Sequence, residues 1–180
     1  LVFIFGGNLG KPQGLDFLIE GVKSCKDIKD IHFIIIGKGT EQKRVFSNLS
    51  KLENVTTLNH LPKEEYLKLC KECDVGLILL DKRFTIPNYP SRTLAYMQNA
   101  MPIFACTDKA TDIKELIEDQ AKCGKWIYSD NPKDFVEGCK WFIENRDILK
   151  ELGMNGRKYM EENFDVTKHI YKIERMVETK

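Results

Sequence analysis

The sequence lacks several features that would assign it quickly to a class of protein. No apolar run approaches the ~20 residues that a membrane-spanning helix needs, and a net charge of +1 gives no global electrostatic case for binding nucleic acid. It contains no Asp-x-Asp pair, the usual mark of a divalent-metal phosphate site, and its three histidines form no Ser/His/Asp or Cys/His arrangement. We therefore expect no metal, no cofactor and no nucleic-acid partner.

Cysteine is present, but it is not arranged for metal or disulfide chemistry. Six scattered cysteines in a chain of 180 residues, long enough to bury a real core, are typical of reduced cytosolic thiols. Cys70 and Cys73 have the spacing of half a zinc site or of a redox pair, but no second pair follows at ligand spacing. We expect both to be packing residues in a cytoplasmic protein.

The chain begins within an expected strand, residues 1–5, which is too short for a signal peptide and does not start with Met. This abrupt start suggests a domain from a longer chain, with part of its site in the missing half. The length indicates one domain, residues 1–180. Any contact with the inner face of the membrane would be made through that missing half.

Strands and helices alternate along most of the chain. The expected strands are residues 1–5, 31–36, 55–58, 75–80, 102–105 and 124–128, and the expected helices between them are 14–24, 40–52, 63–70, 91–99 and 111–118. Strands without in-out alternation that are separated by helices predict a doubly wound parallel sheet, a Rossmann-like α/β fold. After Pro132 we expect only helices, at 133–144, 146–162 and 166–177, with Gly153 and Gly156 weakening the middle one.

Ligands of such folds bind beyond the carboxyl ends of the strands, so the loops after the strands are the candidate sites. Glycines after the first two strands would let a ligand approach the backbone closely, and Lys11 adds a positive charge. Thr40 is the expected N-cap of the second helix, and His60 follows the third strand. Each loop could also be an ordinary strand–helix turn.

The loop after the fourth strand carries the strongest chemical signal. Pro90 suits the first turn of a helix, Ser91 can satisfy a free backbone N–H there, and Arg92 offers a planar, two-pronged phosphate donor. Helix N-termini attract anions, so this stretch suggests a phosphate site. The alternative is an ordinary capped helix with a surface arginine.

Taken together, the loops resemble those of a known family. Gly6-Gly7-Asn8-Leu9-Gly10-Lys11-Pro12-Gln13-Gly14-Leu15 is similar to the first loop of the C-terminal domain of GT-B glycosyltransferases of the group 1, or family 4, type. Ile35-Ile36-Gly37-Lys38-Gly39, Asn59-His60-Leu61-Pro62 and Met101-Pro102-Ile103-Phe104-Ala105 resemble later segments of that domain. Pro90-Ser91-Arg92 ahead of Tyr96-Met97 resembles a capsule and O-antigen sub-branch.

The chain also departs from the family pattern. The two glutamates that most members carry with seven residues between them fall on Pro87 and Ala95 here, and the usual lysine of the first loop is Gln13. The family contacts to ribose and sugar therefore cannot be carried over, and what replaces the glutamates stays open. The phosphate-side candidates that do carry over are Gly7, Lys11, Ser91 and Arg92.

The resemblance implies the donor half of a retaining glycosyltransferase, binding a nucleotide-diphosphate sugar, UDP-sugar rather than GDP-sugar, for transfer to a polysaccharide or lipid-linked acceptor held by the absent N-terminal domain. Segment 164–178 would pack back towards that domain. The expected catalytic residues, which stabilise the leaving phosphate, are Lys11 and Arg92. The expected donor-binding residues are Gly6, Gly7, Asn8, Gln13, Gly37, Lys38, Gly39, His60, Leu61, Tyr89, Pro90, Ser91 and Thr93.

Two other functions stay open. Half of a UDP-sugar 2-epimerase would have the same architecture, although the missing glutamates argue mildly against it. A non-enzymatic regulatory α/β module of the receiver type would need an acidic pair after the first strand, where Gly6-Gly7-Asn8 stands instead.

Overall fold

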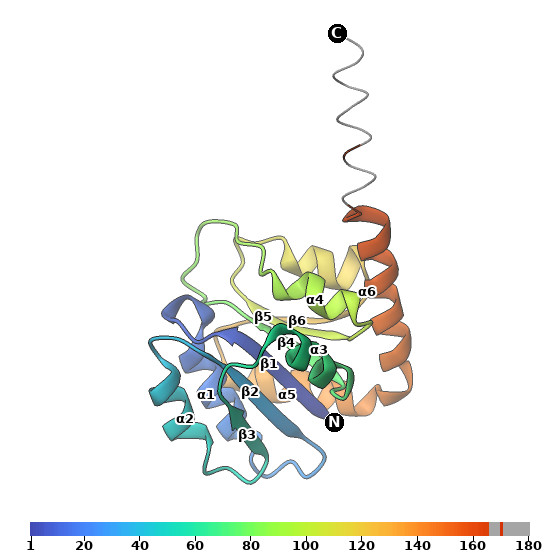
Figure 1. Ribbon diagram of the computed structural model, residues 1–180. Helices are drawn as coiled ribbons and strands as arrows, with labels where there is room; N and C mark the ends of the chain where they lie inside the picture. Colours follow the sequence, from blue (N-terminus) through green and yellow to red (C-terminus); the bar gives the residue numbers. More distant parts are fainter. Residues whose placement is uncertain (166–169, 171–180) are drawn as a thin grey trace.

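A computed structural model describes residues 1–165 and 170. Their strands form one parallel sheet in the order β3-β2-β1-β4-β5-β6 (Figure 1). The strands are β1 (Val2–Asn8), β2 (His32–Lys38), β3 (Val55–Leu58), β4 (Val75–Leu79), β5 (Ile103–Thr107) and β6 (Gly124–Tyr128). The predicted Rossmann-like doubly wound sheet is confirmed, and its strand order reverses between β1 and β4.

Helices cover both faces of the sheet, as the alternating pattern predicted (Figure 1). They are η1 (Lys11–Gln13), α1 (Leu15–Ser24), α2 (Gln42–Leu49), α3 (Lys63–Lys71), α4 (Arg92–Gln98), η2 (Glu115–Gln120), α5 (Pro132–Glu144), η3 (Arg146–Ile148) and α6 (Leu149–Asn163). One core lies between the sheet and helices α1, α2 and α5, and a second lies between the sheet and α3, α4, η2 and α6. Alternate residues of β1 supply them, with Phe3 and Phe5 in the first core and Ile4 in the second.

Several helix boundaries differ from the prediction. Helix α2 begins at Gln42, because Glu41 occupies the N-cap position, so Thr40 is not the cap. The expected helix 111–118 is a wide π-type turn at η2, and 146–162 is divided into η3 and α6. Helix α6 runs through Gly153, where a Cβ atom would lie 1.9 Å from the carbonyl oxygen of Ala100. Glycine here permits close packing of α6 against the end of α4.

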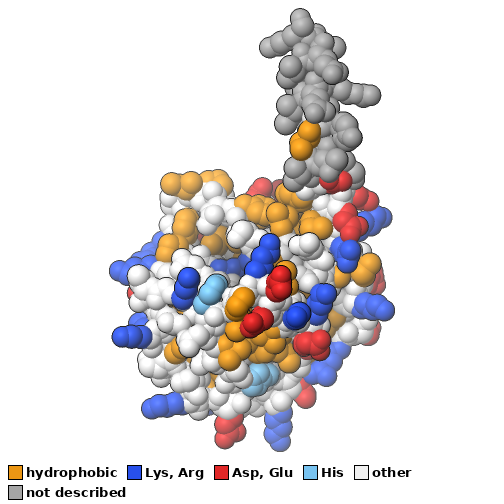
Figure 2. Space-filling view, viewed as in Figure 1, with side chains coloured by type: hydrophobic (Ala, Val, Ile, Leu, Met, Phe, Trp, Pro, Cys, Tyr) orange, Lys and Arg blue, Asp and Glu red, His pale blue; other side chains and the backbone are white. Residues whose placement is uncertain are grey.

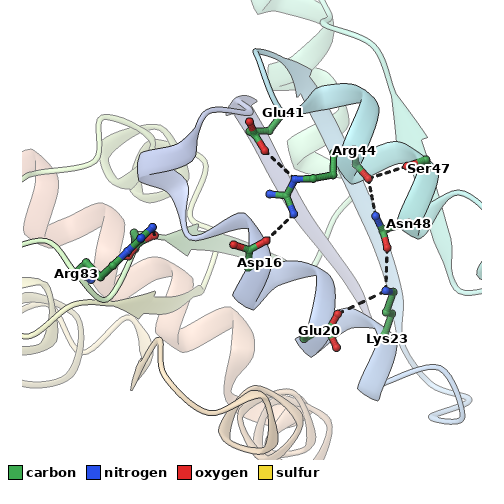
Figure 3. Close-up of polar contacts among 9 residues, drawn as sticks. Asp16, Glu20, Lys23, Glu41, Arg44, Ser47, Asn48 and Arg83 are labelled. Carbon is green, nitrogen blue, oxygen red and sulfur yellow. Dashed lines mark hydrogen bonds and ion pairs between the residues drawn. The ribbon is translucent and has the colours of Figure 1, made fainter.

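The first two strand–helix units are also tied together on the surface. Arg44 of α2 donates through Nε to Glu41 (2.7 Å) and through Nη1 to Asp16 of α1 (2.5 Å), as Figure 3 shows. Lys23 of α1 donates to Asn48 of α2 (2.9 Å). These contacts join α1 to α2 on the surface.

Some expectations fall outside the described part of the chain. The last helix, 166–177, and most of the segment 164–178 lie outside the described residues. Among residues 1–165 and 170, no helix combines the length and the hydropathy that spanning a membrane requires.

Candidate functional site

The carboxyl ends of β1 and β2 approach each other closely at a pair of glycines. Gly7 pairs with Gly37 in register, and a Cβ atom on Gly37 would lie only 2.0 Å from the carbonyl oxygen of Gly7. Leu9 then donates its N–H to the carbonyl of Lys38 (2.9 Å). The two glycine loops expected from the sequence are therefore one continuous backbone surface.

The end of β3 joins this surface through side-chain amides. Gln42 of α2 donates through Nε2 to the carbonyl oxygen of Gly37 (2.7 Å) and to Oδ1 of Asn59 (3.2 Å). His60 and Leu61 follow Asn59, and His60 is exposed. The structure thus aligns the candidates from the first three loops along one edge of the sheet, and Gln42 and Asn59 are members of this edge that sequence reasoning missed.

Arg92 reaches the same edge from the other side of the strand-order reversal. Its Cζ atom lies 4.3 Å from the centroid of the Phe5 ring, a cation–π contact. Its Nη2 atom donates to Oε1 of Gln13 at 2.7 Å. A Cβ atom on Gly7 would lie 3.3 Å from the same Nη2 atom, so the exposed Gly7 backbone borders the guanidinium directly.

The Arg92 guanidinium has no carboxylate partner among the described residues. Its Nη1 atom is enclosed and has no hydrogen-bond partner in the described part of the protein. Burial lowers the pKa of the Arg92 guanidinium below its ordinary value, although arginine stays protonated in proteins. A desolvated cation with an unsatisfied donor is a group that an anionic ligand would stabilise.

Two neutral tyrosine hydroxyls, those of Tyr96 and Tyr66, also lie near Arg92. Tyr96, one turn further along α4, donates to the carbonyl of Ile4 (3.1 Å) and accepts from the hydroxyl of Tyr66 (3.3 Å). Burial raises the pKa of Tyr96 to about 12, so it stays a neutral phenol. The Tyr66 ring lies over Gly6, where a Cβ atom would be 2.3 Å from the ring.

The expected roles of Ser91 as a capping side chain and of Pro90 as a residue of the first helical turn are both wrong. Ser91 is the N-cap residue of α4, but its side chain makes no capping hydrogen bond, because its φ of −57° and ψ of −25° are helical rather than extended. Pro90 precedes the helix, and its carbonyl accepts from the N–H of Thr93 (3.0 Å). The alternative of a capped helix with a surface arginine is also wrong, since Arg92 is partly buried and bonded across the sheet edge.

The remaining candidates make no side-chain hydrogen bond to Arg92 among the described residues. Lys11 is exposed and lines a hollow of about 380 Å³ with Phe84 and Ile86. Tyr89 packs against Phe164 at the end of α6, with ring centroids 5.9 Å apart. Thr93 is fully buried, and its hydroxyl has no partner among the described residues. Asn8 is exposed beside the first loop, with Lys38 and Gly39.

Cys70 and Cys73 are not part of the edge. Cys70, on α3, is buried in the second core, and burial raises the pKa of both thiols, that of Cys73 to about 12. Thiols that stay protonated are poor nucleophiles and poor metal ligands, which agrees with the expected packing role. In the part of the chain that the structure describes, no three His, Cys, Asp or Glu side chains gather as metal ligands would.

A hollow of about 900 Å³ lies at the opposite edge, at the amino ends of β1 and β2 near His32 and Arg146. Doubly wound sheets bind ligands at the carboxyl edge, at the point where the strand order reverses. Arg92 and the glycine loops lie there. We therefore assign the candidate site by chemistry and topology rather than by size.

The fold and this edge define a doubly wound α/β domain with an anion-receptive site at its strand-order reversal. The chain belongs to the Glycosyl transferases group 1 family, which matches residues 1–159. It is 26% identical over 161 residues to an uncharacterised glycosyltransferase, MJ1178, of Methanocaldococcus jannaschii, covering 87% of this chain and 42% of that protein. It is also 26% identical to the probable glycosyltransferase WbjE of Pseudomonas aeruginosa, covering 91% of this chain and 40% of WbjE.

Solved structures agree on the fold. Anabaena Alr3699/HepE in complex with UDP superposes with a TM-score of 0.77 at 18% identity, covering 99% of this chain and 49% of that one. The catalytic domain of a Helicobacter pylori cholesterol-α-glucosyltransferase gives 0.74 at 16% identity, covering 91% and 99%. These neighbours are GT-B glycosyltransferases, so the fold of the chain is that of one GT-B half. The chain spans less than half the length of the curated relatives it matches.

Proposed function

We propose that residues 1–180 form the nucleotide-sugar-binding half of a retaining glycosyltransferase. The observation that supports this most directly is the enclosed guanidinium of Arg92, which lacks a carboxylate partner among the described residues and borders Gly7 at the strand-order reversal. A diphosphate placed there would supply the missing acceptor. Membership of the group 1 family and the UDP complex of the Alr3699/HepE neighbour favour a UDP-sugar as donor.

The same groups would assist the departure of the nucleotide. Cleavage of the sugar–phosphate bond leaves negative charge on the diphosphate, and fixed donors aimed at that charge lower the barrier. Arg92 would supply one such donor, the Gly7 amide a second, and Lys11 a mobile third that closes over the ligand. The base and ribose would extend over Gly37–Gly39 towards His60 and Leu61.

The acceptor would be a growing polysaccharide or a lipid-linked sugar, as in the capsule and O-antigen branch that the Pro90-Ser91-Arg92 stretch resembles. Its binding site would belong to the N-terminal half of the full-length enzyme. A membrane-attached acceptor would bring that enzyme to the inner face of the membrane through the other half. The family glutamates have no acidic counterpart at Pro87 or Ala95, so other groups would hold the donor sugar.

Calorimetric titration of the chain with UDP and with GDP tests the proposal. We expect binding of a nucleotide diphosphate, with UDP the tighter of the two. Because the sequence has no Asp-x-Asp pair, the affinity should be the same in magnesium and in excess chelator. An absence of heat with both nucleotides at millimolar concentration would contradict the donor-domain proposal, and an affinity that collapses in chelator would contradict the metal-independent part.

A further inference from the structure

Gln13 and Arg92 lie on different elements but meet at the candidate site. Gln13 ends η1, in the loop after β1, while Arg92 begins α4, 79 residues later. The 2.7 Å bond from Nη2 of Arg92 to Oε1 of Gln13 is the one side-chain hydrogen bond that Arg92 makes among the described residues. Together with the Phe5 ring beneath the guanidinium, this hydrogen bond fixes the orientation of the guanidinium plane.

The partner is a neutral carboxamide, and this distinguishes Arg92 from Arg44 and Arg83. Arg44 is bonded to Glu41 and Asp16, and Arg83 to Asp81, so carboxylates already balance their charges. An amide oxygen accepts a hydrogen bond from a guanidinium without cancelling its charge. A carboxylate in the same place would form an ion pair that competes with any anionic ligand.

We propose that Gln13 is a positioning residue that orients Arg92 and, because it is neutral, leaves the guanidinium charge available to the diphosphate of the ligand. This inference rests on the proposed function. It assigns Gln13 a role different from the direct donor contact expected from the sequence. Gln13 holds one nitrogen of the guanidinium, and the unpartnered Nη1 atom together with the Gly7 side of Nη2 serve the ligand.

The isosteric substitution Gln13→Glu tests the charge part of this role. The carboxylate keeps the contact to Nη2 but pairs with the charge of Arg92. We expect UDP to bind at least about tenfold more weakly, uridine to bind unchanged, and the melting temperature to stay equal or rise. If Gln13 had a purely structural role, the substitution would not weaken UDP binding while keeping or raising the melting temperature. Gln98→Glu, which adds the same charge at an exposed position of α4, should leave UDP affinity unchanged.

Gln13→Met tests the orienting part, because it keeps the length of the side chain but removes the acceptor. We expect UDP affinity to fall several-fold in the wild-type background and not to fall further in the Arg92→Ala background, since non-additivity marks residues that act through one another. An equal loss in both backgrounds would mean that Gln13 contacts the ligand itself. Tighter binding by Gln13→Met would mean that Gln13 occupies the place of the ligand.

An equal loss of UDP affinity in both backgrounds, or tighter binding by Gln13→Met, would overturn this inference. Unchanged UDP affinity in Gln13→Glu would overturn it as well. Each of these results would leave the proposed nucleotide binding intact. A wild-type chain that binds no nucleotide diphosphate would overturn the proposed function and this inference with it. The two failures are therefore told apart by the wild-type titration.

Discussion

At the scale of the residue, the central feature is that the Arg92 guanidinium is held in place without being neutralised. A charged donor left without a partner in a low-dielectric environment costs roughly 1–3 kcal/mol or more. Such groups are found where a catalytic role or a bound ion or water accounts for them, and perturbed charged groups cluster at functional sites. Its neighbours Gln13, Phe5 and Tyr96 are all uncharged, so nothing in the described surroundings competes with an anion.

Gly7 is the second residue on which the account depends. Its φ of +131° lies where side chains other than glycine are strained, and its Cα faces the guanidinium. Gly7→Ala should destabilise the fold by about 1–3 kcal/mol and weaken UDP binding, because the methyl group would lie 3.3 Å from Nη2 of Arg92. Urea unfolding and UDP titration of the same variant measure both effects.

Gly10→Ala is the matched control in the same loop. Gly10 has an ordinary φ of −114°, and the nearest atom to its added methyl group would be the movable amide end of Asn8. It should cost less stability than Gly7→Ala and little affinity. Equal losses of affinity for the two variants would show that the loop is merely sensitive to any side chain.

At the scale of the element, the position of α4 depends on Tyr96. Its hydroxyl joins α4 to the carbonyls of Ile4 (3.1 Å) and Leu77 (3.3 Å) in the two strands that flank the strand-order reversal. Tyr96→Phe keeps the ring but leaves buried carbonyls and the Tyr66 hydroxyl without this partner, so it should cost about 1–3 kcal/mol. Thermal unfolding checks the loss. Tyr66→Phe should cost less, because Tyr96 keeps both carbonyl bonds, and the reverse order would contradict this account of α4.

The loop between β4 and α4 is tied at its start by Asp81. The backbone N–H of Arg83 (2.9 Å) and its side chain both donate to this carboxylate, and these bonds hold the pKa of Asp81 below its ordinary value of 3.8. A pKa lowered by folding contributes stability above the ordinary value, and that stability is lost as the pH falls through the folded-state value.

Asp81→Asn should therefore destabilise the protein at pH 7, by no more than about 1 kcal/mol because Arg83 is exposed. The difference from wild type should shrink as the pH is lowered below 4. Urea unfolding at pH 7 and pH 3 measures it, with exposed Asp119→Asn as the control. A difference that grows towards low pH would contradict this assignment.

The sequence predicted the elements well where hydrophobic pattern decides them, and less well where geometry does. Strands such as β3 and β6 agree with prediction to the residue, because short segments rich in β-branched and aromatic residues between turns favour the strand conformation. The missing caps at Ser91 and Thr40 could not be predicted, because capping depends on backbone angles set by tertiary contacts.

The sequence predicted which strand-end loops meet at the candidate site, but not the contacts that they make there. Topology places strand-end loops at one edge, so Gly7, Gly37 and Arg92 could be grouped from the sequence. The bond between Gln13 and Arg92 joins residues 79 positions apart, and no local pattern encodes it. Gln42 and Asn59 were missed for the same reason, since their amide pair forms only when α2 and β3 are packed.

At the scale of the whole molecule, apolar side chains gather along the rim above the carboxyl edge (Figure 2). Ile86 and Tyr89, between β4 and α4, and Phe164, at the end of α6, are exposed, Ile86 to 72%. The curated relatives are more than twice as long as the part matched by this chain, and the proposed function assigns acceptor binding to an N-terminal half outside these residues. Under the proposed function, the isolated chain should bind a UDP-sugar but release negligible UDP from it with time. Turnover comparable to that of a full-length protein would contradict this division of labour.

The central claim, that Arg92 binds the diphosphate of a nucleotide, is tested most directly by titrating UDP and uridine into wild type and Arg92→Ala. A charge-assisted phosphate contact contributes roughly 1.5–3 kcal/mol, so UDP should bind about 10- to 100-fold more weakly to the variant. Uridine should bind both proteins equally, Arg92→Lys should recover part of the loss, and Arg157→Ala, on α6, should change nothing. If Arg92→Ala instead weakens UDP and uridine alike and lowers the melting temperature by many degrees, Arg92 is a structural residue and the account is wrong.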